Sequence, residues 1–229
     1  MLIAVGVIGI LLFSFLPQWW VRREFRRYGG RVDALPMTGG DLARHLVKKL
    51  ELAGATVKIT APESDHYDPE SRTIALSPEV HDGKSLTAVA IAAHEVGHAL
   101  QHNLGYRPLY LRWRMAGMVA AAEKTAALLL LSLPLVVIIT RVPALGGLLL
   151  IAGLVMLSLP VMFHLITLPV ELDASFNRAL PFLRRGGYLP EAAVPAADRV
   201  LLAAAFTYVA ASLASLLNFY RWISILRRR

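Results

Sequence analysis

The stretch VPALGGLLLIAGLVMLSLPVMFHLITLPV, residues Val142–Val170, runs for 29 positions without an Asp, Glu, Lys or Arg. A helix of about 20 apolar residues crosses the roughly 30 Å hydrocarbon core of a bilayer, so this stretch is long enough to span a membrane. The runs Met1–Val21 and Val200–Tyr220 also lack these side chains, and a shorter apolar run covers Thr125–Thr140. The sequence therefore predicts a mainly α membrane protein with about four transmembrane helices.

The composition agrees with a membrane protein that has one basic side. Of the 229 residues, 56% are hydrophobic and 17% are charged, whereas a soluble domain has about a quarter charged residues. The formal net charge of +8 is explained by anionic lipid headgroups, so we expect the lipid bilayer as a partner and no nucleic acid. The chain has no cysteine, so histidine and carboxylate side chains have to hold any metal ion.

The distribution of charge predicts five parts along the chain. The two polar parts carry arginines next to the expected membrane helices, so the positive-inside rule places both on the cytoplasmic side. The basic tail Arg227–Arg229 disagrees with this topology, because it would lie on the outer side of the membrane if the last helix crosses the bilayer. The disagreement disappears if that helix is re-entrant or tilted. The parts are a membrane anchor (1–21), a cytoplasmic subdomain (22–114), a transmembrane hairpin (115–170), a cytoplasmic segment (171–199), and a fourth membrane helix with a basic tail (200–229).

The cytoplasmic subdomain has the pattern of a small α+β unit. A helix is expected over Leu42–Leu52, where leucines recur four positions apart, and a second one over Ser85–Asn103. The alternating stretch Ala55–Thr60 and the stretch Arg72–Leu76 are expected to be strands, and Ser64–Pro69 between them has turn chemistry. We therefore expect a short β-hairpin beside the second helix.

The second helix carries the motif HEVGH at residues 94–98. His94 and His98 are four positions apart, so both imidazoles can reach one ion from the same helix face. Glu95 projects beside them, where a carboxylate can take a proton from an activated water and return it to a leaving amine. The preceding run LTAVAIAA is apolar, so the helix is expected to be buried. Burying two histidines without a function would cost free energy, which argues against a chance occurrence of the motif. The pattern predicts one catalytic Zn²⁺ per chain in a zincin-like subdomain.

A catalytic zinc needs a third protein ligand and an open position. His102 continues the i, i+4 series, but it lies about 12 Å along the helix axis from His94, too far to share the ion. Glu171 follows the third membrane span on the same side as the HEVGH motif, which favours it as the ligand over an ordinary interfacial charge. The acidic residues downstream of the motif are Glu123, Glu171, Asp173, Glu191 and Asp198.

Several stretches resemble the YugP-type putative neutral zinc metallopeptidases of bacterial membranes, over nearly the whole chain. More distantly, the chain is similar to the HtpX and CAAX-prenyl-protease group, which pairs an HExxH helix with a glutamate in a later E-x-x-A-D stretch. The resemblance implies the zinc ligands His94, His98 and Glu171, the general base Glu95, and a multi-pass protein of the bacterial inner membrane. The stretches are SDHYDP (64–69), TIALS (73–77), AAHEVGH (92–98) and LPVELDA (168–174).

The chain departs from the E-x-x-A-D pattern at one position, where Ser175 replaces the aspartate. A carboxylate that orients a zinc histidine has to come from elsewhere, and Asp173 is our candidate. In zincins an edge strand upstream of the HExxH helix pairs with the substrate; Arg72–Leu76 is the candidate here, although it can also simply cover the helix. Candidate donors to the oxyanion of the reaction are His66, Tyr67, Arg199 and Tyr208.

These observations predict a membrane-integral zinc-dependent metalloendopeptidase that cleaves peptides or proteins, including membrane proteins, near the cytoplasmic face. A site-2-type intramembrane protease is a second interpretation, but it would place HExxH inside a span, whereas His94 lies between polar segments. A non-catalytic membrane scaffold stabilised by zinc is a third. A purely structural zinc site would not need Glu95 and would be closed by a fourth ligand.

Overall fold

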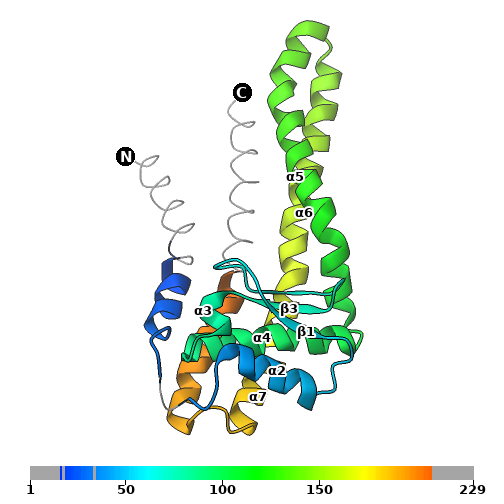
Figure 1. Ribbon diagram of the computed structural model, residues 1–229. Helices are drawn as coiled ribbons and strands as arrows, with labels where there is room; N and C mark the ends of the chain where they lie inside the picture. The colour runs from blue at the N-terminus through cyan, green and yellow to red at the C-terminus, as the bar shows by residue number, and fades with distance from the viewer. Residues whose placement is uncertain (1–15, 17–18, 33–34, 208–229) are drawn as a thin grey trace, which may run out of the picture.

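The computed structural model describes residues 16, 19–32 and 35–207. Its described part is a base of helices around a small sheet, from which one long helical hairpin projects (Figure 1). The predicted mostly helical fold is confirmed. Residues 19–27 and 194–207 are helical, but most of the expected anchor and of the expected fourth membrane helix lies outside the described residues.

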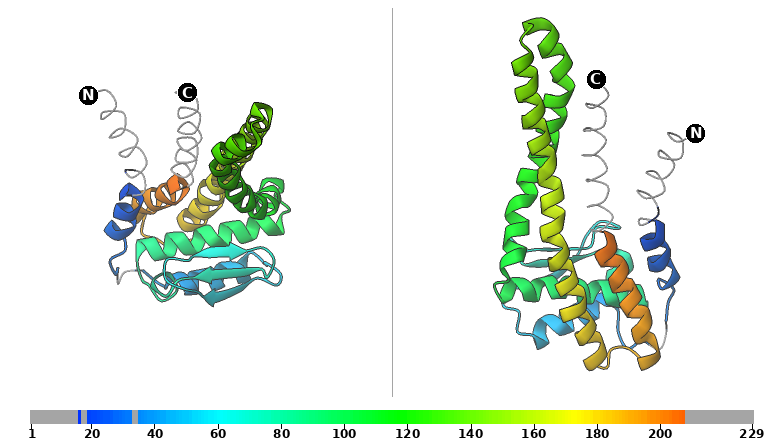
Figure 2. Two further views of the ribbon diagram at one scale, coloured as in Figure 1. Left: turned by 90° about the horizontal axis from the view of Figure 1, so that it is seen from above. Right: turned by 180° about the vertical axis from the view of Figure 1, so that it is seen from behind.

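Two helices form the core of the base. Helix α2, Gly39–Lys49, begins with a capping box in which the Thr38 hydroxyl accepts the amide of Asp41, so it starts three residues before the expected position. Helix α4, Leu86–Asn103, begins where the Ser85 side chain accepts the amide of Ala88, close to the prediction. Most of α4 is buried, since it lies between the sheet on one side and the base of the hairpin on the other (Figure 2, left).

The sheet differs from the expected hairpin. Strands β1 (Thr56–Ile59), β2 (His66–Asp68) and β3 (Thr73–Leu76) have the order β1-β3-β2, with β1 parallel and β2 antiparallel to β3. The prediction of a hairpin between the first and last of these stretches was therefore wrong. The stretch read as a turn contains β2, because the carboxylate of Asp68 accepts amide hydrogens from Glu70 and Ser71 and so places the turn after the strand.

The order of the strands also corrects the expected substrate-binding edge. Strand β3 is central and buried at all four positions, so Arg72–Leu76 is not an edge strand. Within the described residues, β2 is the outer strand on its side of the sheet. The side chain of Asp65 fixes its start, because it accepts the amide and the hydroxyl of Ser77 at 2.6 and 3.1 Å. Short helix α3, Pro78–His81, follows directly.

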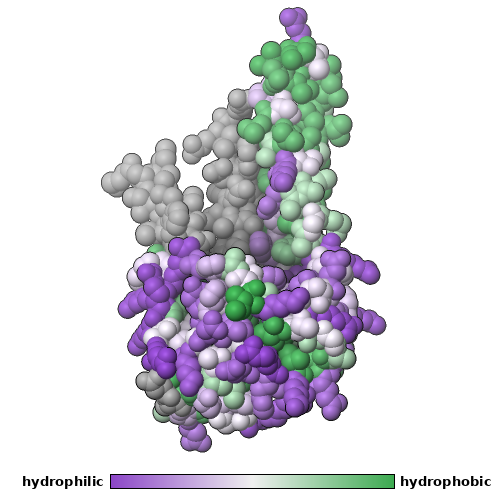
Figure 3. Space-filling view, in the orientation of Figure 1, coloured by the Kyte–Doolittle hydropathy of each residue, from purple (hydrophilic) through white to green (hydrophobic). Residues whose placement is uncertain are grey.

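The projecting hairpin consists of α5, Arg107–Thr140, and α6, Pro143–Leu172, with Arg141 in the left-handed conformation between them. Gly146 and Gly153 allow close packing, since a Cβ at either would clash with Val137 or Leu130. Among the described residues, two helices are long and apolar enough to span a membrane: Arg107–Thr140 and the continuous helix Pro143–Arg185. The outer part of the hairpin is hydrophobic on its surface, whereas the base is mainly hydrophilic (Figure 3).

The end of α6 leads into the base without a break. A π-helical segment, η1 (Asp173–Ala179), follows α6, and α7 (Leu180–Arg185) continues it. In η1 the amide of Leu180 donates to the carbonyl of Ser175, five positions earlier. The 3₁₀ turn η2, Glu191–Ala193, precedes the last described helical residues. This arrangement places the start of η1 against the middle of α4.

Candidate metal centre

Helices α4 and α6 bring His94, His98 and Glu171 together, and all three are buried. The Nε2 atom of His94 lies 3.1 Å from Nε2 of His98 and 3.1 Å from Oε2 of Glu171. The Nε2 atom of His98 lies 3.4 Å from the same carboxylate oxygen. Atoms that bind a tetrahedral Zn²⁺ at about 2.0–2.2 Å lie roughly 3.3–3.5 Å from one another. The separation of 3.4 Å agrees with this spacing and the two of 3.1 Å are slightly shorter, so a small outward movement of the side chains would admit the ion.

Glycine in the motif allows the two helices to meet. A Cβ atom at Gly97 would lie 2.8 Å from the carbonyl oxygen of Ala174 in η1, closer than a side chain tolerates. Gly97 is one position before His98, and Ala174 is three after Glu171. The close backbone contact therefore sets the distance between the histidines on α4 and the carboxylate at the end of α6.

A chain of hydrogen bonds fixes which nitrogen of His98 faces the other ligands. The side-chain nitrogen of Gln101 donates to the carbonyl of Val170 and to Asp173, each at 2.8 Å, so its oxygen has to point the other way. That oxygen lies 2.9 Å from Nδ1 of His98 and can only accept. His98 therefore carries its proton on Nδ1, which leaves the Nε2 lone pair directed at the metal position.

His94 is oriented by the residue that departs from the E-x-x-A-D pattern. The hydroxyl of Ser175 lies 3.0 Å from Nδ1 of His94. Asp173, our candidate for this role, reaches His98 only through Gln101, and it also accepts hydrogen bonds from Arg178 and Asn177. Sequence analysis singled out neither Gln101 nor Ser175 as a functional residue. The signal for Gln101 was its position three residues after His98, on the same helix face.

Glu95 follows His94 in the chain and lines one pocket with His94 and His98. Burial raises the pKa of Glu95 from its usual 4.5 to about 7, with His94 opposing the shift and the negative charge of Glu171 adding to it. A carboxyl group with a pKa near 7 can both hold and release a proton at neutral pH. This is the property that a general base needs if it later acts as a general acid.

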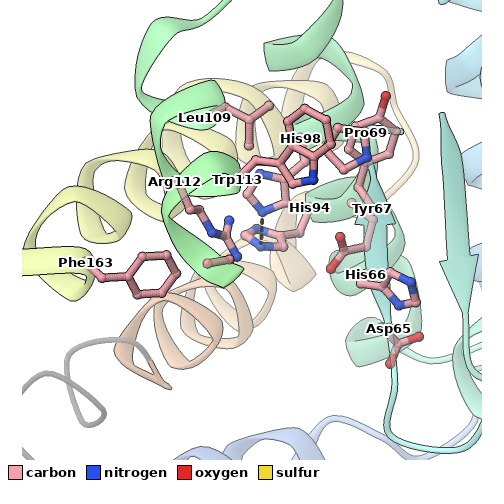
Figure 4. A pocket seen from close by; sticks show the side chains of 12 residues that line it. Asp65, His66, Tyr67, Pro69, His94, His98, Leu109, Arg112, Trp113 and Phe163 are labelled. Carbon is pink, nitrogen blue, oxygen red and sulfur yellow. Dashed lines mark hydrogen bonds between the residues drawn. The ribbon is translucent and has the colours of Figure 1, made fainter. Parts of the chain in front are cut away.

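The pocket at the centre has a volume of about 240 Å³ and lies between the sheet and the hairpin of α5 and α6 (Figure 4). Arg112 of α5 lines the pocket with its positive charge, and its Nη1 atom lies 2.6 Å from Oε1 of Glu171. Sequence analysis took Arg112 only as a charge flanking the membrane. The lining residues are Asp65, His66, Tyr67, Pro69, His94, Glu95, His98, Leu109, Arg112, Trp113, Ala116 and Phe163.

Two of the four candidate oxyanion donors line this pocket. His66 donates from Nδ1 to the carbonyl of Ser64 at 2.8 Å, so its Nε2 can donate only when the ring is protonated. The hydroxyl of Tyr67 lies 2.7 Å from Nδ1 of His102, and burial raises the pKa of Tyr67 to about 12, so the hydroxyl keeps its proton. That proton is available to an oxyanion when Nδ1 of His102 is the donor in this hydrogen bond. Arg199 is exposed on the helix at 194–207 and does not line the pocket, and Tyr208 lies outside the described residues.

Comparisons with known proteins agree with this site. A family model described as "putative neutral zinc metallopeptidase" matches residues 3–227. The chain belongs to this family. It is 37% identical over 227 residues to the "Putative membrane protease YugP" of Bacillus subtilis (strain 168), which covers 98% of this chain and 96% of that protein. No solved structure matches the chain.

Membership of the neutral zinc metallopeptidase family carries coarse functional information. A peptidase family implies peptide or protein substrates, and its zinc agrees with the possible metal site at His94, His98 and Glu171. Two candidate membrane helices in the described residues, together with a relative named as a membrane protease, point to association with a membrane.

Proposed function

We propose that this protein is a membrane-integral, zinc-dependent endopeptidase that hydrolyses peptide bonds near the cytoplasmic face of a bacterial inner membrane. The observation that carries the proposal is the convergence of His94, His98 and Glu171 beside a pocket that His94, His98 and Glu95 line. The donor set of two imidazoles and one carboxylate is the set used by catalytic zinc with one position left open. One ion per chain fits it.

The residues of the chain divide the chemistry between them. A bound Zn²⁺ supplies Lewis-acid activation of a water molecule and of the scissile carbonyl. Glu95 takes a proton from the attacking water and passes it to the nitrogen of the leaving amine. His66 and Tyr67 line the cleft from the other side, and these two are the oxyanion donors that we retain.

Strand β2 takes the role that we first assigned to β3. An extended substrate can add to the outer edge of β2 through main-chain hydrogen bonds, beside the pocket that holds Glu95. Such pairing recognises the backbone rather than the sequence. It therefore suits an enzyme that cleaves unfolded or extended segments, including those of membrane proteins.

The membrane topology is argued from exposure and charge. Large apolar side chains on the hairpin are exposed, among them Leu131 at 68%, Ile138 at 72% and Leu148 at 63%, as expected for contact with lipid. In the sequence, arginines cluster at both ends of the hairpin, and by the positive-inside rule this supports the proposal of a cytoplasmic metal centre. The cluster comprises Arg107, Arg112, Arg114, Arg178, Arg184 and Arg185.

The alternatives fit the observations less well. In a site-2-type protease the HExxH helix would cross the membrane, whereas α4 packs between the sheet and the hairpin in the base. A zinc-stabilised scaffold would not need Glu95 and would be closed by a fourth protein ligand, whereas the described residues offer the three ligands His94, His98 and Glu171. We therefore retain the scaffold only as the outcome of a failed activity test.

The test compares the wild type with Glu95→Gln and uses Glu191→Gln, an exposed carboxyl, as the matched control. Each full-length protein is purified in detergent, its zinc is measured by mass spectrometry, and cleavage of an unfolded protein is followed. We expect one zinc per chain in all three and cleavage by the wild type and the control alone. Equal cleavage by Glu95→Gln removes Glu95 as the base, and zinc without any cleavage favours the scaffold.

A further inference from the structure

The cleft beside the metal centre has two walls of different chemistry (Figure 4). The wall formed by β2 and its flanks is polar and carries Asp65, His66 and Tyr67. The opposite wall belongs to the membrane hairpin and is mainly apolar. Its members are Leu109, Trp113 and Ala116 on α5 and Phe163 on α6, with Arg112 as its one charged side chain.

The apolar wall follows one face of α5. Leu109, Trp113 and Ala116 are four and three positions apart, which makes them neighbours on the helix surface. Leu109 is buried, whereas Trp113 keeps 45% of its surface exposed. A large indole that borders a buried cleft and is still half exposed offers apolar area that leaves water when a ligand covers it.

The size of the cleft restricts what can cover the indole. Its volume of about 240 Å³ is below the roughly 300–1,000 Å³ of pockets for drug-sized ligands, so it accepts one or two side chains of an extended segment. Successive side chains of a segment paired with β2 point to opposite sides. One of the two substrate side chains next to the metal centre therefore faces Trp113 and Phe163.

We propose that this hairpin wall selects the substrate, and that the cleaved segment carries a large apolar side chain, such as Leu, Met or Phe, directly beside the scissile bond. The inference rests on the proposed peptidase function and adds the substrate class to it. Burial of such a side chain against Trp113, Leu109 and Phe163 raises kcat/KM about 10- to 100-fold over a small polar one. The helices that expose apolar surface to lipid thus also form the specificity pocket.

The test uses full-length protein in detergent and pairs of peptides that differ only beside the cleaved bond, with Phe or Ser. The cleaved bond is first located by mass spectrometry of the products of an unfolded protein. We expect the wild type to prefer the Phe peptide about 10- to 100-fold in kcat/KM. Trp113→Ala should bring the ratio close to one, and Trp113→Phe should keep it. Leu111→Ala, which truncates an exposed side chain on the same helix outside the cleft, should also keep it.

A binding measurement separates this inference from the peptidase function itself. In the Glu95→Gln background, fluorescence anisotropy of labelled peptides should show tighter binding of the Phe peptide, and the preference should vanish when Trp113→Ala is added. If the wild type binds zinc and cleaves nothing, the peptidase function fails, and this binding preference still supports the wall as the binding surface. Equal binding of both peptides, or an equal loss of preference in Leu111→Ala, overturns the proposal.

Discussion

Arg112 on α5 contacts the carboxylate of Glu171 on α6, with Nη1 2.6 Å from Oε1, while the other oxygen of Glu171 faces the two histidines. Each oxygen of this fully buried carboxylate therefore has a separate task. One is held by a cation of the protein, and the other is available to a metal ion. The ion pair joins α5 and α6 to each other beside the metal centre.

Loss of this cation should destabilise the metal-free protein most. In Arg112→Ala the buried charge of Glu171 loses its counter-charge, at a cost of roughly 2–4 kcal/mol, below that of a fully buried pair because the Arg112 side chain is 23% exposed. Bound zinc supplies a second cation, so the loss should be smaller with zinc. Thermal unfolding in the presence of a chelator and in the presence of zinc measures the loss of stability in the two states. Arg114→Ala, which removes an exposed arginine, serves as the control. An equal loss in both states would contradict this account.

Gly97→Ala should separate α4 from η1. The added methyl group would lie 2.8 Å from the carbonyl oxygen of Ala174, and the backbone has to move to relieve the contact. We expect a loss of about 1–3 kcal/mol in stability and a weaker zinc site, because the ligands on the two helices move apart. Chelator competition and thermal unfolding measure these effects. Gly147→Ala, where a Cβ meets nothing within 4 Å, should change neither, and a similar effect there would refute the explanation.

Gln101→Met should weaken zinc binding while it keeps the volume of the side chain. Without the amide oxygen, the Nδ1 proton of His98 has no acceptor, and the ring is no longer held with Nε2 directed at the ion. Partners of metal-binding histidines contribute about 10- to 100-fold to affinity, and we expect a loss in that range. Chelator competition measures it. Asn103→Ala, an exposed amide two positions further on, is the control, and unchanged affinity in Gln101→Met would remove Gln101 from the site.

Asp65→Asn should flatten the pH dependence of stability. Burial raises the pKa of Asp65 above 3.8, so the folded protein binds this proton more tightly than the unfolded chain does. The tighter proton binding adds to the free energy of unfolding, fully below pH 3.8, and this contribution is lost as the pH rises through the raised pKa. An asparagine still accepts the Ser77 amide and donates to its hydroxyl. We therefore expect the variant to equal the wild type in acid and to exceed it at pH 7.

Unfolding of the chelated protein at a series of pH values tests this prediction. Glu70→Gln, an exposed carboxyl in the turn after β2, serves as the control and should follow the wild type at every pH. Parallel curves for wild type and Asp65→Asn would show that the buried carboxyl does not contribute to the pH dependence.

Sequence analysis found the elements whose signals are local. Helix α4 has a continuous apolar run and a serine cap, and the hairpin helices are long and apolar. Glu171 was favoured because the end of a predicted membrane span has to lie near the domain that it rejoins. The order of the strands was predicted wrongly because pairing is non-local. The short stretch around His66 has the residues of a turn, and only its position beside β3 makes it a strand.

The residues that hold the ligands were harder to predict for a similar reason. Arg112 is one of several arginines near a membrane helix, and its contact with Glu171 depends on how α5 packs against α6. Ser175 was noticed only as a departure from a pattern, although its hydroxyl meets His94. Such roles follow from the distance between helices, which Gly97 sets and which the sequence states only indirectly.

In the sequence, the two histidines precede the hairpin, whereas Glu171 stands at its end. The metal donors are therefore synthesised at different times. A ribosome releases α4 first, so the growing chain holds two of the three metal donors while α5 and α6 are still being made. Under the proposed topology, the third donor arrives only after the hairpin has entered the bilayer and returned. Under the proposed function, a partly inserted chain would lack one of the three metal donors, and the peptidase would become active only once its insertion is complete.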